Sequence, residues 1–330
     1  MSYNIFMVRK IAPAVFILTL MILTACRSER KASPSAADLP IQPPTATRTL
    51  RPTLTPFPPP TRRATLTPEP SNTPINITVT PTWKQAGERI IIQTEDGLQL
   101  IGYYYIAPQP NAPVVVLMHQ FGSNQAQAWP QSDLIPWLQN YPVHGTNPPE
   151  PTRSAQGKLP LMPSDLHFNV LTFDFRGHGE SEGQVISSIT DEAKRGYLLD
   201  AKAAYARAAS LPYADPNRII GIGTSIGADA VVDSCNQGCV GAFAISPGSV
   251  LGLSWQDNAY RVTNAGKPVR CMYSVNSPSA NECLSLAETA FYKVLAAEGK
   301  KHGEDFLVPR KMEAGFGQAL LEFLLAAVKR

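Results

Sequence analysis

The 330-residue sequence predicts an α/β fold with a mostly parallel central sheet, flanked by helices, over residues 85–330. Short apolar runs alternate with helical patterns throughout this stretch, as they do in chains that build parallel sheets. The run 113–118 is apolar along its whole length, which is typical of a strand buried on both faces, and 169–175 is expected to be another buried strand. A hydrophobic content of 44% is sufficient for one large core.

The elements are expected in a simple order. Residues 88–93 and 98–106 flank a Thr-Glu-Asp-Gly turn and predict an opening antiparallel hairpin. A helix is expected at 191–209, where apolar residues recur at helical spacing and Thr190 can cap the first turn. Further strands are expected at 218–223, 240–245, 268–274 and 291–297, with helices after Ser225 and at 315–328. Residues 124–164 read as a helix followed by a surface loop rich in proline and glycine.

The first 26 residues have the features of an export signal. Arg9 and Lys10 precede an apolar run at 11–23, which is shorter than the roughly 20 residues that span a bilayer. The run ends in Leu-Thr-Ala-Cys and resembles a bacterial lipobox, which implies that Cys26 is lipidated and becomes the mature N-terminus. The alternative is an ordinary transmembrane anchor that contains a cysteine. Either interpretation places the remainder outside the cytoplasm, tethered to a bacterial membrane.

Residues 27–84 are expected to form a disordered tether. They hold 13 of the 31 prolines, with many threonines and few aromatic residues, so they cannot bury enough surface to fold. An extended proline-rich chain of this length could hold a domain on the order of 100 Å from a membrane. The first 84 residues contain ten lysines and arginines against three acidic residues, a charge of +7 within a total of +3. The domain is therefore acidic, which argues against nucleic-acid binding.

The motif Gly-Thr-Ser-Ile-Gly at residues 223–227 follows an expected strand and precedes an expected helix. This G-x-S-x-G pattern is typical of a nucleophile elbow, a sharp turn that exposes a serine hydroxyl at its apex. Side chains in place of the two glycines would collide with the neighbouring strand or helix. Ser225 is therefore the candidate nucleophile, although a glycine-rich turn is common in any parallel-sheet protein.

A nucleophilic serine needs a base and two donors for the oxyanion. The histidines of the chain are His119, His144, His167, His178 and His302. If the base follows the nucleophile in the chain, His302 is the candidate, the alternative being a solvated loop histidine between lysine and glycine. The backbone N–H of Ile226 at the start of the next helix is one expected donor, and that of Phe121, in the loop after residues 113–118, is the other. His119 is expected to be structural.

Taken together, these motifs resemble the α/β-hydrolase superfamily over residues 88–329. The elbow at 223–227, the His-Gln-Phe-Gly loop at 119–122, the run Asp-Phe-Arg-Gly-His-Gly-Glu-Ser at 174–181 and His-Gly at 302–303 follow that family's order. The resemblance implies an α/β-hydrolase fold and serine esterase chemistry, with Arg176 and His178 shaping a turn. Gln120 departs from the family's usual glycine.

The acid that should orient His302 is missing from its usual place. The family supplies an aspartate or glutamate just after the strand before the histidine, where this chain reads Tyr-Ser-Val-Asn-Ser-Pro at 273–278. The carboxylates between Ser225 and His302 are Asp229, Asp233, Asp257, Glu282, Glu288 and Glu298. Asp257 and Glu282 remain candidates, and Asn276 could orient the ring without supplying charge.

Four cysteines remain once Cys26 is assigned to lipid, an even number in an exported protein. Of the three possible pairings we expect the local one, Cys235 with Cys239 and Cys271 with Cys283. The second bond would draw Glu282 away from His302. The alternative is four reduced, buried cysteines. No metal site is expected, because no Cys or His pair has zinc spacing, and no cofactor is expected.

The sequence therefore predicts an extracytoplasmic serine hydrolase that cleaves esters of a small-molecule acyl substrate through an acyl-enzyme on Ser225. Residues 247–266 either line an apolar acyl pocket or simply pack, and we expect them to form a loop. One alternative is a surface-displayed binding or structural module that kept the fold and lost the chemistry. Another is a peptidase or thioesterase, which would use the same residues. The oligomeric state is left open.

Overall fold

The computed structural model describes residues 87–141, 158–184 and 190–329. The expected signal peptide, lipobox and tether lie outside these residues, as does His144. Within them, no helix combines the length and the apolarity needed to cross a bilayer.

The described residues form one eight-stranded sheet in the order β1-β2-β4-β3-β5-β6-β7-β8. β1 and β2 form the expected opening hairpin, β2 pairs antiparallel with β4, and all other pairs are parallel. The sequence prediction of a mostly parallel sheet is confirmed. The strands are β1 (Glu88–Gln93), β2 (Gln99–Tyr105), β3 (Ala112–Met118), β4 (Asn169–Phe173), β5 (Ala214–Thr224), β6 (Cys239–Ile245), β7 (Val269–Ser274) and β8 (Tyr292–Ala297).

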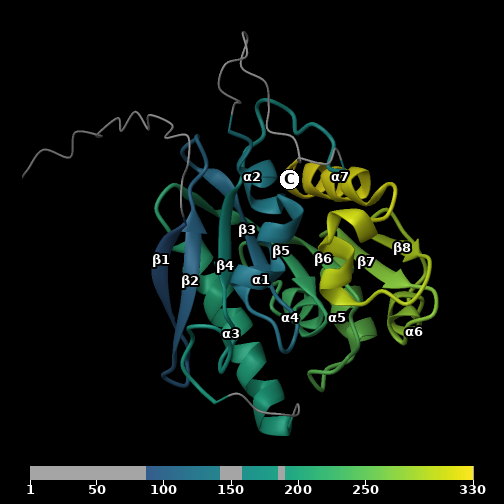
Figure 1. The fold of residues 1–330 in the computed structure, drawn as a ribbon, viewed down its shortest axis with the longest axis horizontal. Coiled ribbons are helices and arrows are strands. Elements are labelled where there is room, and N and C mark those ends of the chain that lie inside the picture. Colours follow the sequence, from purple (N-terminus) through teal and green to yellow (C-terminus); the bar gives the residue numbers. More distant parts are fainter. Residues whose placement is uncertain (1–86, 142–157, 185–189, 330) are drawn as a thin grey trace, which may run out of the picture. The chain divides into compact units, whose positions relative to one another are not determined.

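Helices cover both faces of the sheet (Figure 1). α3, α4 and α5 contribute to the apolar core on one face, and α2 and α7 to the core on the other. The α-helices are α1 (Gln125–Ala128), α2 (Leu134–Gln139), α3 (Asp191–Ala209), α4 (Ile226–Asp233), α5 (Trp255–Asn264), α6 (Ser279–Cys283) and α7 (Phe316–Val328). Short 3₁₀ turns are η1 (Pro130–Ser132), η2 (Gly303–Leu307) and η3 (Pro309–Lys311).

The alternation of side chains along β3 explains why its sequence is apolar throughout. Val114, Val116 and Met118 belong to the core under α3 and α4, whereas Val115 and Leu117 belong to the core on the opposite face. Successive residues of a strand point to opposite faces, so a strand covered on both sides needs apolar residues at every position.

The expectation of a loop at 247–266 is wrong in its second half, where α5 forms. Ser254 caps this helix by accepting a hydrogen bond from the Asp257 N–H, and Trp255, Ala259 and Val262 are buried at helical spacing. Leu251 and Trp255 belong to the core. These residues pack into the core, and Leu251 and Trp255 also line a small cavity beside Asp229.

Both disulfides expected from the sequence are present, Cys235–Cys239 and Cys271–Cys283. The first closes the short segment between α4 and β6. The second ties α6 to β7, the strand that ends near the candidate site. No cluster of three or more His, Cys, Asp or Glu residues suited to a metal ion occurs in the part of the chain that the structure describes.

Candidate active site

Ser225 stands at a strained turn between β5 and α4. Its backbone angles are φ 52° and ψ −114°, a conformation that few non-glycine residues adopt. A Cβ on Gly223 would lie 2.1 Å from the Gly227 carbonyl oxygen, and one on Gly227 would lie 2.2 Å from that of Met118. Both glycines are therefore required by close backbone approach. The turn has the geometry expected of a nucleophile elbow.

His302 lies beside this serine although 77 residues separate the two in the chain. Its Nε2 is 2.9 Å from Ser225 Oγ, a hydrogen-bond distance. His302 is exposed as a residue, although surrounding protein partly desolvates its imidazole. Nucleophile and base of an acyl-transfer site need this contact, because the base removes the hydroxyl proton as the oxygen attacks.

Side chains at the ends of two strands hold the backbone around His302. Ser274, at the end of β7, accepts the Lys301 N–H at 3.2 Å and donates to the Gly299 carbonyl at 2.7 Å. Ser246, just after β6, accepts the Gly303 N–H at 3.1 Å. At the end of β7, where an acid was expected, Ser274 therefore stands. It holds the backbone before His302 and does not contact the imidazole through a hydrogen bond.

None of the three residues considered for the acid reaches His302. Asn276 and Asp257 are exposed, Asp257 on the first turn of α5. Glu282, next to Cys283 of the second disulfide, accepts the Ser249 hydroxyl at 2.9 Å. Across the described ranges, no carboxylate forms a hydrogen bond with the His302 imidazole.

The carboxylate whose charge acts on His302 is Asp305, which the sequence analysis missed. Burial lowers the pKa of His302 below its ordinary 6.5, and the charge of Asp305 partly opposes this. Asp305 accepts the His302 backbone N–H at 3.3 Å and forms an ion pair with Lys311. The expected chain order of serine, acid and histidine places the acid before His302, whereas Asp305 follows it. In the sequence, an acidic residue three positions after the histidine could have pointed to this interaction.

The two expected oxyanion donors flank a close backbone contact. A Cβ on Gly227 would lie 2.8 Å from the His119 carbonyl oxygen, so the start of α4 abuts the end of β3. This contact brings the peptide of Ile226 near the loop that carries Phe121. Neither N–H donates to another group of the described residues. Both are therefore available to a ligand oxygen.

Two other motif histidines, His119 and His178, make structural contacts. His119 is fully buried, which lowers its pKa to about 3 and keeps the ring neutral. Its Nε2 accepts the Phe175 N–H at 3.0 Å, so its Nδ1–H donates to the Gln120 carbonyl at 2.7 Å. His178 Nε2 accepts the Gly122 N–H at 3.1 Å and supports the loop around Phe121.

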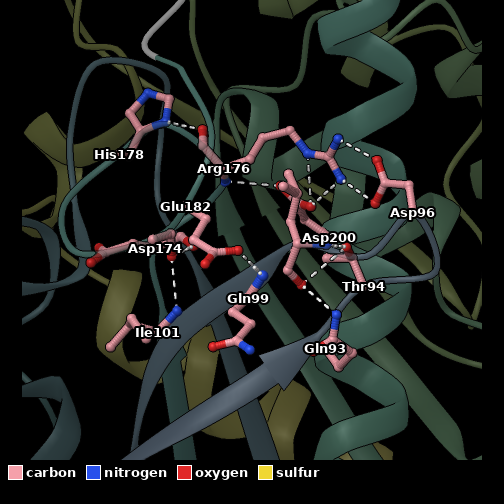
Figure 2. A network of polar contacts seen from close by, with 12 residues as sticks. Gln93, Thr94, Asp96, Gln99, Ile101, Asp174, Arg176, His178, Glu182 and Asp200 are labelled. Carbon is pink, nitrogen blue, oxygen red and sulfur yellow. Dashed lines mark hydrogen bonds and ion pairs between the residues drawn. The ribbon is translucent and has the colours of Figure 1, made fainter.

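Arg176 anchors the turn after β4 (Figure 2). Its guanidinium binds the carboxylates of Asp96 and Asp200, with N–O distances of 2.7 Å to each. Asp200 is buried in α3, so this pair ties the turn to both that helix and the first hairpin. The structural role expected for Arg176 agrees with these contacts, none of which involves Ser225 or His302.

No family model matches the chain. It is 33% identical over 144 residues to the quorum-quenching protein AidA of Acinetobacter baumannii (strain MDR-ZJ06), covering 38% of this chain and 45% of that protein. It is 27% identical over 172 residues to the uncharacterized protein YfhR of Salmonella typhi, covering 51% of this chain and 46% of that protein. The chain thus spans about half the length of the curated relatives it matches.

Solved structures show the fold more fully. The esterase Pf2001 of Pyrococcus furiosus superposes with a TM-score of 0.50 at 19% identity, covering 75% of this chain and 97% of that one. The hydrolase GrgF of Penicillium sp. sh18 gives a TM-score of 0.51 at 15% identity, covering 74% and 100%. Est1E of Butyrivibrio proteoclasticus gives 0.50 at 14% identity, covering 73% and 100%. At such identities the similarity establishes the shared fold alone.

Proposed function

We propose that this protein, which has the α/β-hydrolase fold, is a serine hydrolase that cleaves carboxylic esters through an acyl-enzyme on Ser225. The observation that carries the proposal is the contact of 2.9 Å between Ser225 Oγ and His302 Nε2 at a strained elbow. The preference for esters over thioesters or peptides follows from the esterases among the structural neighbours. The same residues would serve all three.

In acylation, His302 Nε2 takes the hydroxyl proton while Ser225 Oγ attacks the acyl carbon. The negative charge that forms on the carbonyl oxygen is stabilised by the N–H groups of Phe121 and Ile226. The tetrahedral intermediate then expels the alkoxide, which takes the proton from the imidazolium and leaves as the alcohol. Water deprotonated by His302 attacks the acyl-enzyme in the same way, and the acid and free serine are released.

Turnover and active-site labelling test the proposal together. The purified protein is offered p-nitrophenyl esters of increasing chain length, a thioester and a peptide anilide, and is then treated with a fluorophosphonate probe. We expect ester hydrolysis and labelling of Ser225, both lost in Ser225→Ala, because the probe reacts with an activated serine. Folded wild-type protein that neither reacts with the probe nor hydrolyses any of these substrates would refute the proposal.

A second candidate is a binding or structural module with weakened chemistry. It is favoured by one observation, that no carboxylate in the described ranges hydrogen-bonds the His302 imidazole. Loss of the third triad member alone costs on the order of 10⁴-fold in rate in well-studied enzymes, yet leaves measurable catalysis. Labelling of Ser225 at a rate no faster than that of free serine would favour this candidate.

We further propose that Cys26 carries a lipid and tethers the domain outside the cytoplasm of a bacterium. The support is the sequence at residues 9–26, since dual acylation is enough for stable membrane attachment. In a bacterial host grown with labelled palmitate, the full chain is expected to incorporate label and to sediment with membranes, and Cys26→Ser to lose the label. Equal incorporation in the two proteins would exclude this assignment.

A further inference from the structure

Gln120, the residue that departs from the family's usual glycine, reaches the loop that carries His302. Its side-chain Oε1 accepts the backbone N–H of Glu304 at 3.0 Å. Its own backbone N–H donates to the Glu304 carboxylate, Oε1, at 3.2 Å. The two residues lie 184 positions apart in the chain and bind each other twice. Glutamine at position 120, where the family usually has glycine, thus adds a side-chain hydrogen bond to the backbone one between the loop of Phe121 and the loop of His302.

Glu304 also holds the far side of the loop around Phe121. Its Oε2 accepts the hydroxyl of Ser123 at 2.8 Å. Phe121 thus lies between two residues bound by one carboxylate, while Gly122 is held by His178. Ser123 is buried and Glu304 half-buried, and burial raises the pKa of this carboxyl. No cation of the described ranges forms an ion pair with Glu304. Such a carboxylate is costly to bury unless its hydrogen bonds are satisfied, and here both oxygens have partners.

Gly303 provides the room for this contact. A Cβ at that position would lie 2.1 Å from Gln120 Oε1, and the residue has a positive φ of 52°. The positive φ favours glycine after His302, and the absence of a Cβ there leaves the Gln120 side chain in its place.

We infer that Glu304 is a positioning residue which, together with Gln120, clamps the loop carrying His302 to the loop carrying Phe121. The inference rests on the proposed function, since these loops supply the base and an oxyanion donor. Transition-state stabilisation needs both groups in one geometry relative to Ser225 Oγ, and displacements near 1 Å are costly. The clamp joins these two loops directly, in addition to the anchoring of each loop on the sheet.

The test compares Glu304→Ala with Glu304→Gln, using ester kinetics and hydrogen exchange of the amides at 120–123. We expect Glu304→Ala to lower kcat by about 10- to 100-fold with KM nearly unchanged, because the geometry of the transition state is lost rather than substrate binding. The hydrogen-bonded amides of this loop, those of Gln120, Gly122 and Ser123, should exchange about 10-fold faster. Glu304→Gln should largely retain both properties, since its amide can accept from the Gln120 N–H and donate to the Ser123 hydroxyl.

Two further variants separate the clamp from general stability. Glu282→Ala removes another glutamate–serine hydrogen bond, of 2.9 Å to Ser249, and should leave exchange at 120–123 unaltered. Combining Glu304→Ala with Gln120→Ala should cost little more than either alone, because both break one unit.

The inference is overturned if Glu304→Ala leaves the exchange of 120–123 unchanged, or if Glu304→Gln is as impaired as Glu304→Ala. Wild-type protein without ester turnover or probe labelling would instead defeat the proposed function. The exchange comparison would still decide whether the clamp orders the loop around Phe121.

Discussion

Replacing His302 with alanine is expected to lower kcat/KM for an ester by about 10³-fold or more, because general-base catalysis and the orientation of the serine are lost together. The structural basis is the 2.9 Å contact between Nε2 and Ser225 Oγ. The measurement is steady-state hydrolysis of the best ester found, with the rate of probe labelling as a second readout. Both should fall, since both depend on deprotonation of one hydroxyl.

His167→Gln is the matched control for that substitution. His167 is buried, and its Nδ1 lies 3.1 Å from the Gln139 carbonyl, a contact that glutamine can replace in part. This variant is expected to lose stability but to keep kcat per folded molecule. If His302→Ala retained wild-type kcat/KM, the imidazole would not be the base.

The pH profile should identify the same group. The neutral imidazole is the active form, so activity is lost as pH falls through the pKa of His302. Burial lowers that pKa, which places the acidic limb of kcat/KM below the ordinary value of 6.5. Asp305→Asn removes the charge that opposes this effect and should move the limb to still lower pH. Asp257→Asn should not move it, whereas a shift with Asp257→Asn alone would make Asp257 the partner of His302.

Gly227→Ala is expected to lower the free energy of unfolding by about 3 kcal/mol or more, because the added Cβ meets backbone rather than a side chain that can rotate away. The Cβ would lie 2.2 Å from the Met118 carbonyl oxygen and 2.7 Å from its carbon. Urea unfolding followed by circular dichroism measures the loss. Any variant that still folds should also lose activity, because the Ile226 N–H moves with the helix.

Gly248→Ala serves as the control for this prediction. The nearest atom to a Cβ there is Val250 Cγ1 at 3.1 Å, the tip of a side chain on an exposed loop residue. We expect its unfolding free energy to change by less than about 1 kcal/mol. Equal destabilisation by the two substitutions would show that the close approach at Gly227 is relieved by a backbone shift.

The local motifs were predictable because their residues are neighbours in the chain. β3 is apolar at every position because helices cover both its faces. Gly223 reflects a contact with Gly227 four residues on, whereas Gly227 itself meets the end of β3 at Met118, a contact that the motif signals without naming the partner. The pairing Cys271–Cys283 was predictable because the two cysteines are 12 residues apart in the chain. The helix α5 replaces part of the expected loop because Ser254 caps its first turn and Trp255, Ala259 and Val262 bury one face.

The sequence by itself determined the fold class, the elbow at Ser225 and the order of the motifs. Only the tertiary structure decided what surrounds His302: serines at the ends of two strands, Asp305 one turn later, and Glu304 bound to Gln120. The physical reason is that parallel strands bring their carboxyl ends together at one edge of the sheet, whatever their separation in the chain. Side chains placed there meet partners up to 184 residues away, and no local pattern records such a contact.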